Sequence, residues 1–171
     1  FRNRKCSHAR YHPEDERHQP LPPRCIIYAY CLMPNHVHLL LREKEESLAS
    51  VMKSIGVAYA WHYNTKYQHL GSIFQDRFRS EPVNTDTYFF TLLRYIHQNP
   101  IKDGLVNEVH LYEWSSWREY EGTPFICSTK PVTNRMPYEE LKALVFEPLP
   151  KTTLVLDIDN DKRRRTDEEV S

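Results

Sequence analysis

Two histidines flank a valine in the stretch Met33-Pro34-Asn35-His36-Val37-His38-Leu39-Leu40-Leu41. On a β-strand, side chains at positions i and i+2 point to the same face, so His36 and His38 can bind one divalent cation together. Imidazole is the commonest protein ligand for metal ions. A strand that exposes two histidines to solvent explains the same pattern, so the motif alone leaves both interpretations open.

A second chemical pattern lies at the end of a predicted helix, capped by Asp86 and covering residues 87–99. Tyr95 and Asn99 are four residues apart, which places a phenol and an amide oxygen on one helical face. Pro100 disfavours helical geometry at the preceding residue, so we expect the helix to end at Asn99 with Tyr95 in its last turn. A metal ion with a tyrosine nucleophile beside it can break a phosphodiester bond.

The histidine pair needs a strand to hold it, and the flanking sequence predicts one. Residues 25–32 are rich in β-branched and aromatic side chains, and residues 37–41 return after a turn at Pro34-Asn35. We expect a β-hairpin whose second arm begins with the histidines. The apolar run of this hairpin indicates a central position in the sheet.

A long helix is predicted after the hairpin, capped by Ser47 and running to about Tyr67, with Gly71 as a stop signal. Tyr59 and Tyr63 are neighbours on this helix. Packing residues and a base-stacking platform are both consistent with that pair, and packing is favoured.

Residues 72–83 alternate charged and apolar side chains, which predicts a further strand. Arg77 and Arg79 would share one face of it, where they could contact successive phosphates or form a solvated face.

The C-terminal part of the chain offers two weaker signals. Four aromatic residues fall within residues 112–120, which predicts an element that caps the core, with base stacking as the alternative. A short helix is expected over residues 137–146.

The length of 171 residues predicts one domain with tails. With 23 Lys and Arg against 23 Asp and Glu, net charge does not indicate a nucleic-acid binder, so any phosphate-binding surface must come from local clustering. We predict a cytoplasmic protein with free thiols, because there is no Cys-x-x-Cys pair, signal peptide or apolar run long enough to span a membrane.

Four blocks of the sequence together resemble the single-tyrosine HUH transposases, with the REP-associated tyrosine transposases as the nearest branch. The blocks are Ala29-Tyr30-Cys31-Leu32-Met33-Pro34-Asn35-His36-Val37-His38-Leu39-Leu40, Phe74-Gln75-Asp76-Arg77-Phe78, Leu93-Arg94-Tyr95-Ile96-His97-Gln98-Asn99-Pro100 with Gly104-Leu105-Val106, and Trp114-Ser115-Ser116. The resemblance divides the chain into a catalytic domain at 25–122, an irregular basic segment at 1–24 in which the family's first strand and helix are not recognisable, and an extension at 123–171 with a charged tail from 151.

The resemblance implies an α+β fold, in which an antiparallel sheet of ferredoxin-like or RRM-like topology has helices on one face and the metal site on the other. It assigns His36, His38 and Asn99 as ligands of magnesium or manganese and Tyr95 as the nucleophile, with Gln98 as a weaker ligand candidate. It implies cleavage and rejoining of single-stranded DNA beside hairpins, through a 5′-phosphotyrosine. The protein would act as a homodimer or a monomer, with no membrane involved. Candidate phosphate contacts are Arg77, Arg79, Arg94 and Lys102.

Two functions other than DNA cleavage are also consistent with the sequence. A domesticated copy could bind DNA hairpins without cutting them. A structural zinc protein could use Cys25, Cys31, His36 and His38, although a hairpin would spread these side chains over both of its faces.

Overall fold

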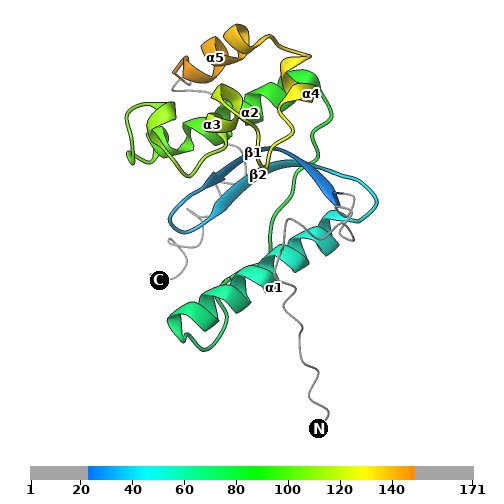
Figure 1. Cartoon of the computed structure of the whole chain (residues 1–171), viewed down its shortest axis with the longest axis vertical. Coiled ribbons are helices and arrows are strands. Elements are labelled where there is room, and N and C mark those ends of the chain that lie inside the picture. The colour runs from blue at the N-terminus through cyan, green and yellow to red at the C-terminus, as the bar shows by residue number, and fades with distance from the viewer. Residues whose placement is uncertain (1–22, 149–171) are drawn as a thin grey trace, which may run out of the picture.

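The computed structural model describes residues 23–148, which form two strands, five α-helices and one short 3-10 helix. Figure 1 shows the two strands as a ribbon in the middle of the molecule, with α1 on one side and α2 to α5 on the other. The protein is therefore α+β, with helices packed against an antiparallel sheet, as the sequence predicts. Most of the predicted basic segment 1–24 and all of the charged tail from 151 lie outside the described residues.

The predicted hairpin is present, formed by β1 (Cys25–Leu32) and β2 (Val37–Glu43). Its register pairs Cys31 with His38 and Leu32 with Val37, and a bulge interrupts the ladder between Ile27 and Ala29.

The outer edge of β1 is also hydrogen-bonded. The N–H of Leu32 donates to the Trp114 carbonyl at 2.9 Å, and the Tyr30 and Ile27 carbonyls accept from Ser116 and Ser128 at 3.0 and 2.8 Å. Both edges of β1 are therefore hydrogen-bonded, one of them by irregular segments. The described residues form a sheet of two strands, so the central position predicted for the hairpin is wrong.

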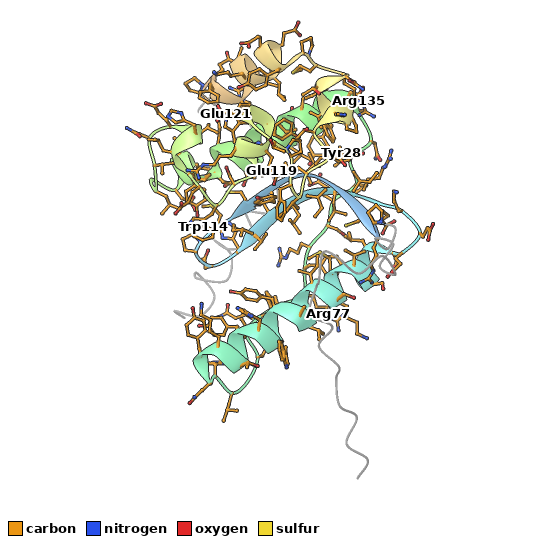
Figure 2. The ribbon with its side chains drawn as sticks, viewed as in Figure 1. Tyr28, Arg77, Trp114, Glu119, Glu121 and Arg135 are labelled. Carbon is orange, nitrogen blue, oxygen red and sulfur yellow. The ribbon has the colours of Figure 1, made fainter. Side chains whose placement is uncertain are left out.

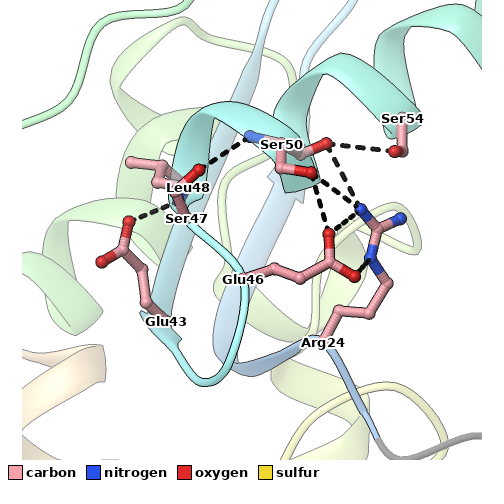
Figure 3. Close-up of polar contacts among 7 residues, drawn as sticks. All are labelled: Arg24, Glu43, Glu46, Ser47, Leu48, Ser50 and Ser54. Atoms are coloured by element: carbon pink, nitrogen blue, oxygen red, sulfur yellow. Dashed lines mark hydrogen bonds and ion pairs between the residues drawn. The ribbon is translucent and has the colours of Figure 1, made fainter.

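Helix α1 (Leu48–Tyr67) begins at Ser47, whose hydroxyl accepts the Ser50 N–H, as predicted. Figure 3 shows the polar contacts that hold this end: Arg24 pairs with Glu46, and Glu43 accepts the N–H of Leu48. At the other end Gln68 takes a left-handed conformation with φ of 50°, so the helix ends before Gly71.

Most of α1 is exposed, with Val51 as its buried residue. Tyr59 is 50% exposed, and its ring lies 6.1 Å from that of Tyr63 and 5.9 Å from that of Phe74. The two tyrosines thus pack against each other, and Tyr59 also packs against Phe74, on the surface and not in the core.

The strand predicted over residues 72–83 is wrong. This segment is irregular, and Phe74 and Phe78 remain 50% and 44% exposed. Alternation of side chains is only a local signal, whereas a strand also needs a partner edge, and neither strand of the sheet pairs with residues 72–83. Val83 alone packs against the core.

Helix α2 (Asp86–Lys102) differs from its prediction at both ends. Thr85, not Asp86, is the cap, and its hydroxyl accepts the Tyr88 N–H at 3.2 Å. The predicted stop at Asn99 is wrong, because the helix continues through Pro100, which is fully buried. Packing of the proline ring compensates for its missing N–H, and the Asn99 carbonyl still accepts the Asp103 N–H at 2.9 Å.

The core lies between the hairpin and α2 and extends to the C-terminal helices. It includes Ala29 and Leu40 from the strands and Leu93 from α2. The expected helix at 137–146 is confirmed as α5 (Tyr138–Phe146), which packs on α2 and buries Leu141 and Val145. Residues of the predicted extension thus share one core with the hairpin.

Trp117 and Tyr120 confirm that the 112–120 segment caps the core, since both are buried, whereas Trp114 is 57% exposed. The segment includes α3 (Trp117–Glu121) and follows the 3-10 helix η1 (Val109–Leu111). A single turn, α4 (Lys130–Thr133), leads to α5 and buries Val132.

Candidate functional site

The histidine pair lies where the turn of the hairpin joins β2. The Nε2 atoms of His36 and His38 are 3.0 Å apart, and the ring planes are nearly perpendicular at 88°. Both side chains are half-buried. The two imidazoles therefore converge on one point, as the i, i+2 spacing predicts.

The turn preceding β2 fixes the position of His36. The N–H of Met33 donates to the His36 carbonyl at 2.9 Å, and the Met33 side chain is buried. On the exposed side of the turn, Nδ1 of His36 lies 2.6 Å from Oδ1 of Asn35. Because a carbonyl oxygen only accepts, this contact favours the tautomer of His36 that carries its proton on Nδ1.

Tyr95 of α2 lies directly against the histidine pair. Its ring centroid is 5.6 Å from that of His38, in an edge-to-face arrangement with 84° between the planes. Nζ of Lys102 also lies over the Tyr95 ring, 5.3 Å from its centroid. Tyr95 is only 5% exposed, so its phenol is largely covered in this conformation.

The contact between His38 and Tyr95 determines the side of the sheet on which the site lies. His38 and α2 are on the same side, so the histidine pair faces α2. The expected location on a face opposite the helices is therefore wrong, because the site lies between the hairpin and the helix that carries the tyrosine.

Asn99 follows Tyr95 by one turn of α2. It is 3% exposed, and its Nδ2 donates to the Tyr95 carbonyl at 3.2 Å. The amide oxygen of Asn99 is the atom type that a magnesium or manganese ion binds.

Gln98 and Arg94 point elsewhere. The amide nitrogen of Gln98 donates to the carbonyls of Val145 and Glu147, both at 2.6 Å. Nη2 of Arg94 donates to the carbonyls of Glu147 and Pro148 at 2.6 and 2.7 Å. In this structure both side chains fasten α5 and the residues after it to α2.

Four residues are candidate DNA contacts: Arg77, Arg79, Arg94 and Lys102. Lys102 contacts Tyr95 of the site, because its Nζ lies over the Tyr95 ring. Figure 2 shows Arg77 beside α1, away from Trp114, which lies beside the hairpin turn. Arg79 is exposed in the same irregular segment as Arg77. Their role as phosphate contacts stays a prediction.

The cysteines do not complete a metal site with the histidines. Cys25 pairs with Glu43 at the open end of the hairpin, about 20 Å from Cys31 by strand geometry. Burial raises the pKa of the Cys31 thiol to about 12, with Asp103 adding to the effect, so Cys31 is a neutral thiol. Within residues 23–148, no three His, Cys, Asp or Glu side chains gather as a metal-binding group.

The sequence patterns did not single out Asn35 or Glu119. Asn35 was predicted only as a turn residue. Its position directly before His36 is the sequence feature that could have indicated a contact with the histidine pair. Glu119 is 8% exposed and accepts three consecutive backbone N–H groups, those of Phe125, Ile126 and Cys127, each at 2.7 Å. No local sequence pattern predicts that a carboxylate will accept three consecutive backbone N–H groups.

A family model described as "Transposase IS200 like" matches residues 23–99. The match contains the hairpin, the histidine pair, Tyr95 and Asn99, so the chain is similar to this transposase family over these residues. No curated protein and no solved structure matches the chain. Within the described residues, no helix is long and apolar enough to cross a lipid bilayer.

Proposed function

We propose that this protein is a transposase that cleaves and rejoins single-stranded DNA beside hairpins of REP-like elements, through a 5′-phosphotyrosine on Tyr95. The observation that carries the proposal is the contact between His38 and Tyr95, whose ring centroids are 5.6 Å apart although 57 residues separate them in the chain. The family match supports transposition and single-strand cleavage as the general activity.

The geometry of the histidine pair fits a divalent cation. Two nitrogens that bind one ion at about 2.1 Å and at right angles to each other lie about 3 Å apart, and the Nε2 atoms are 3.0 Å apart. With its proton on Nδ1, His36 offers a lone pair on Nε2. Asn99 would add its amide oxygen. Two imidazoles with one oxygen ligand and open positions for water suit magnesium or manganese.

Such an ion, when bound, would act as a Lewis acid that polarises the non-bridging oxygens of the scissile phosphate. The chain supplies the nucleophile. The Tyr95 Oη forms a bond to phosphorus, the bond from phosphorus to the 3′ oxygen breaks, and the phenol proton ends on the released 3′-hydroxyl. Attack by a second 3′-hydroxyl reverses these changes and joins a new strand, so rejoining needs no ATP.

The burial of Tyr95 sets a condition on this reaction. A phenol that is 5% exposed must be uncovered before a phosphate can reach its oxygen. Lys102, whose ammonium lies over the Tyr95 ring, is positioned to exchange that contact for the incoming phosphate. We propose a homodimer acting on cytoplasmic DNA, with Arg77 and Arg79 as further candidate phosphate contacts.

The test uses single-stranded hairpin oligonucleotides taken from the DNA around the protein's own gene, labelled at the 3′ end. The fragment that carries the 5′-phosphate becomes attached to the protein, so cleavage transfers the label to a protein band on a denaturing gel. We expect this band only with magnesium or manganese. Tyr95→Phe and His36→Ala should each abolish it.

Tyr59→Phe and His62→Ala are matched controls on the exposed surface of α1 and should leave the band unchanged. A labelled band that persists in Tyr95→Phe would refute the assignment of the nucleophile. Hairpin binding without any adduct in the unmodified protein would instead support the silent DNA-binding protein.

A further inference from the structure

The Asn35 side chain lies against the histidine that the proposed metal site uses. Its Oδ1 is 2.6 Å from Nδ1 of His36, while Nε2 of the same ring is 3.0 Å from Nε2 of His38. The two nitrogens of His36 therefore have separate partners, one outside the pair and one inside it.

We propose that Asn35 is a positioning residue that holds the proton of His36 on Nδ1 and directs the Nε2 lone pair toward His38, where a divalent cation would bind. The inference rests on the proposed function, because the cation is the magnesium or manganese ion of the proposed DNA cleavage. Asn35 itself does not contact the ion in this arrangement.

The chemistry of imidazole makes such a partner consequential. A neutral imidazole carries one proton, and either nitrogen can hold it. A ring with its proton on Nε2 has no lone pair there and cannot bind a cation through that atom. An acceptor at Nδ1 favours the competent form, as carbonyl and carboxylate partners do for histidines in many metal sites.

The turn makes Asn35 a fixed acceptor. Pro34 restricts the backbone immediately before it, and the bond from the Met33 N–H to the His36 carbonyl, at 2.9 Å, closes the turn around it. Met33 anchors this turn because its side chain is 7% exposed. Asn35 itself is exposed, so its substitution does not disturb the core.

The same tautomer of His36 implies a direction for the bond between the histidines. Because Nε2 of neutral His36 is an acceptor, the proton between the rings comes from Nε2 of His38. A divalent cation would take the place of that proton, with His38 changing its tautomer and His36 already in the required form.

The experiment compares the full chain with Asn35→Leu, which has similar size but no acceptor, and Asn35→Asp, which keeps an oxygen acceptor. The first readout is the tautomer of His36 in metal-free protein, from two-bond ¹H–¹⁵N spectra at a pH where the ring is neutral. The second is the dissociation constant for Mn²⁺, from calorimetric titration. Circular dichroism and thermal unfolding check that each variant is folded.

We expect His36 to carry its proton on Nδ1 in the unmodified protein and in Asn35→Asp, and to lose this preference in Asn35→Leu. Groups that hydrogen-bond to the outer nitrogen of metal-bound histidines contribute about 10- to 100-fold to affinity, so Asn35→Leu should weaken Mn²⁺ binding by at least about 10-fold. Asn35→Asp should stay within a few-fold of the unmodified protein.

A Mn²⁺ affinity in Asn35→Leu equal to that of the unmodified protein would overturn the inference, as would an Asn35→Asp variant as weak as Asn35→Leu. His36→Ala separates this failure from that of the proposed function. If His36→Ala weakens Mn²⁺ binding and Asn35→Leu does not, only the role of Asn35 is wrong. If the unmodified protein does not bind Mn²⁺, or His36→Ala binds it equally well, the metal site and the role of Asn35 fail together.

Discussion

His97 and Ser116 are joined by a hydrogen bond inside the core, with 2.9 Å between Nε2 and Oγ. Nδ1 of His97 lies 2.8 Å from the Leu93 carbonyl, so the ring carries its proton there and accepts the serine proton at Nε2. Ser116 Oγ in turn accepts the Tyr30 N–H at 2.9 Å. This chain of bonds ties α2, which carries Tyr95, to β1, the strand paired with His38.

The stability of the protein should fall on acidification because His97 is buried and neutral. Burial lowers its pKa from 6.5 to about 4, although the Leu93 carbonyl opposes the shift. Below pH 6.5 the unfolded chain binds a proton that the folded chain excludes. The free energy of unfolding should therefore drop by about 3 kcal/mol as the pH falls from about 6.5 to 4.

Denaturant unfolding at several pH values measures this loss. The variant His97→Gln should be less stable at pH 7 but should have a flatter pH profile between 6.5 and 4. An unchanged slope in this variant would show that another group is responsible.

Glu119 should stabilise the loop that follows α3 through its carboxylate. Partial burial raises its pKa, but the N–H groups of Cys127, Phe125 and Ile126 and the hydroxyl of Tyr30 outweigh burial and hold the pKa below the usual 4.5. Because the folded pKa is depressed, this contribution is complete above pH 4.5 and is lost as the pH falls through the folded value.

The variant Glu119→Gln should lose about 1–3 kcal/mol of stability at neutral pH. Hydrogen exchange should accelerate at the amides of Phe125, Ile126 and Cys127, which lose their charged acceptor. Equal exchange rates in the variant and the unmodified protein would contradict the role given to the carboxylate.

Gly56 in the middle of α1 should tolerate alanine. A Cβ added there would lie 3.8 Å from the Phe74 ring, which is ordinary van der Waals contact. Alanine is favoured over glycine inside a helix, so Gly56→Ala should raise the free energy of unfolding by about 0.5–1 kcal/mol.

Gly104 is the matched control, because it has φ of +71° after the end of α2. Gly104→Ala has free space around its Cβ but a strained backbone, so it should be destabilising. Thermal unfolding of the two variants should give shifts of opposite sign, and shifts of the same sign would contradict this account.

Gln98 and Asn99 should separate into a structural and a metal-binding role. Gln98→Leu removes the donor to Val145 and Glu147, so it should cost about 1–3 kcal/mol of stability while Mn²⁺ affinity stays unchanged. Asn99→Leu should weaken Mn²⁺ binding and DNA cleavage. Calorimetric titration of both variants measures the difference, and a loss of Mn²⁺ affinity in Gln98→Leu would reverse the assignment.

The sequence by itself determined the elements that depend on nearby residues. The hairpin, its histidine pair, the helix from Leu48 to Tyr67 and the helix at Tyr138–Phe146 all follow from local spacing, turn residues and capping. Two histidines at i, i+2 share a face wherever the backbone is extended, so their convergence needed no tertiary information.

Only the tertiary structure decided what those elements meet. Residues 72–83 have the alternation of a strand but gain no partner edge, and Pro100 stays within α2 because the core buries its ring. The contact between His38 and Tyr95 and the bond between His97 and Ser116 join residues that lie far apart in the chain. Such contacts depend on which faces pack together, and local sequence patterns carry no information about the partner of a face.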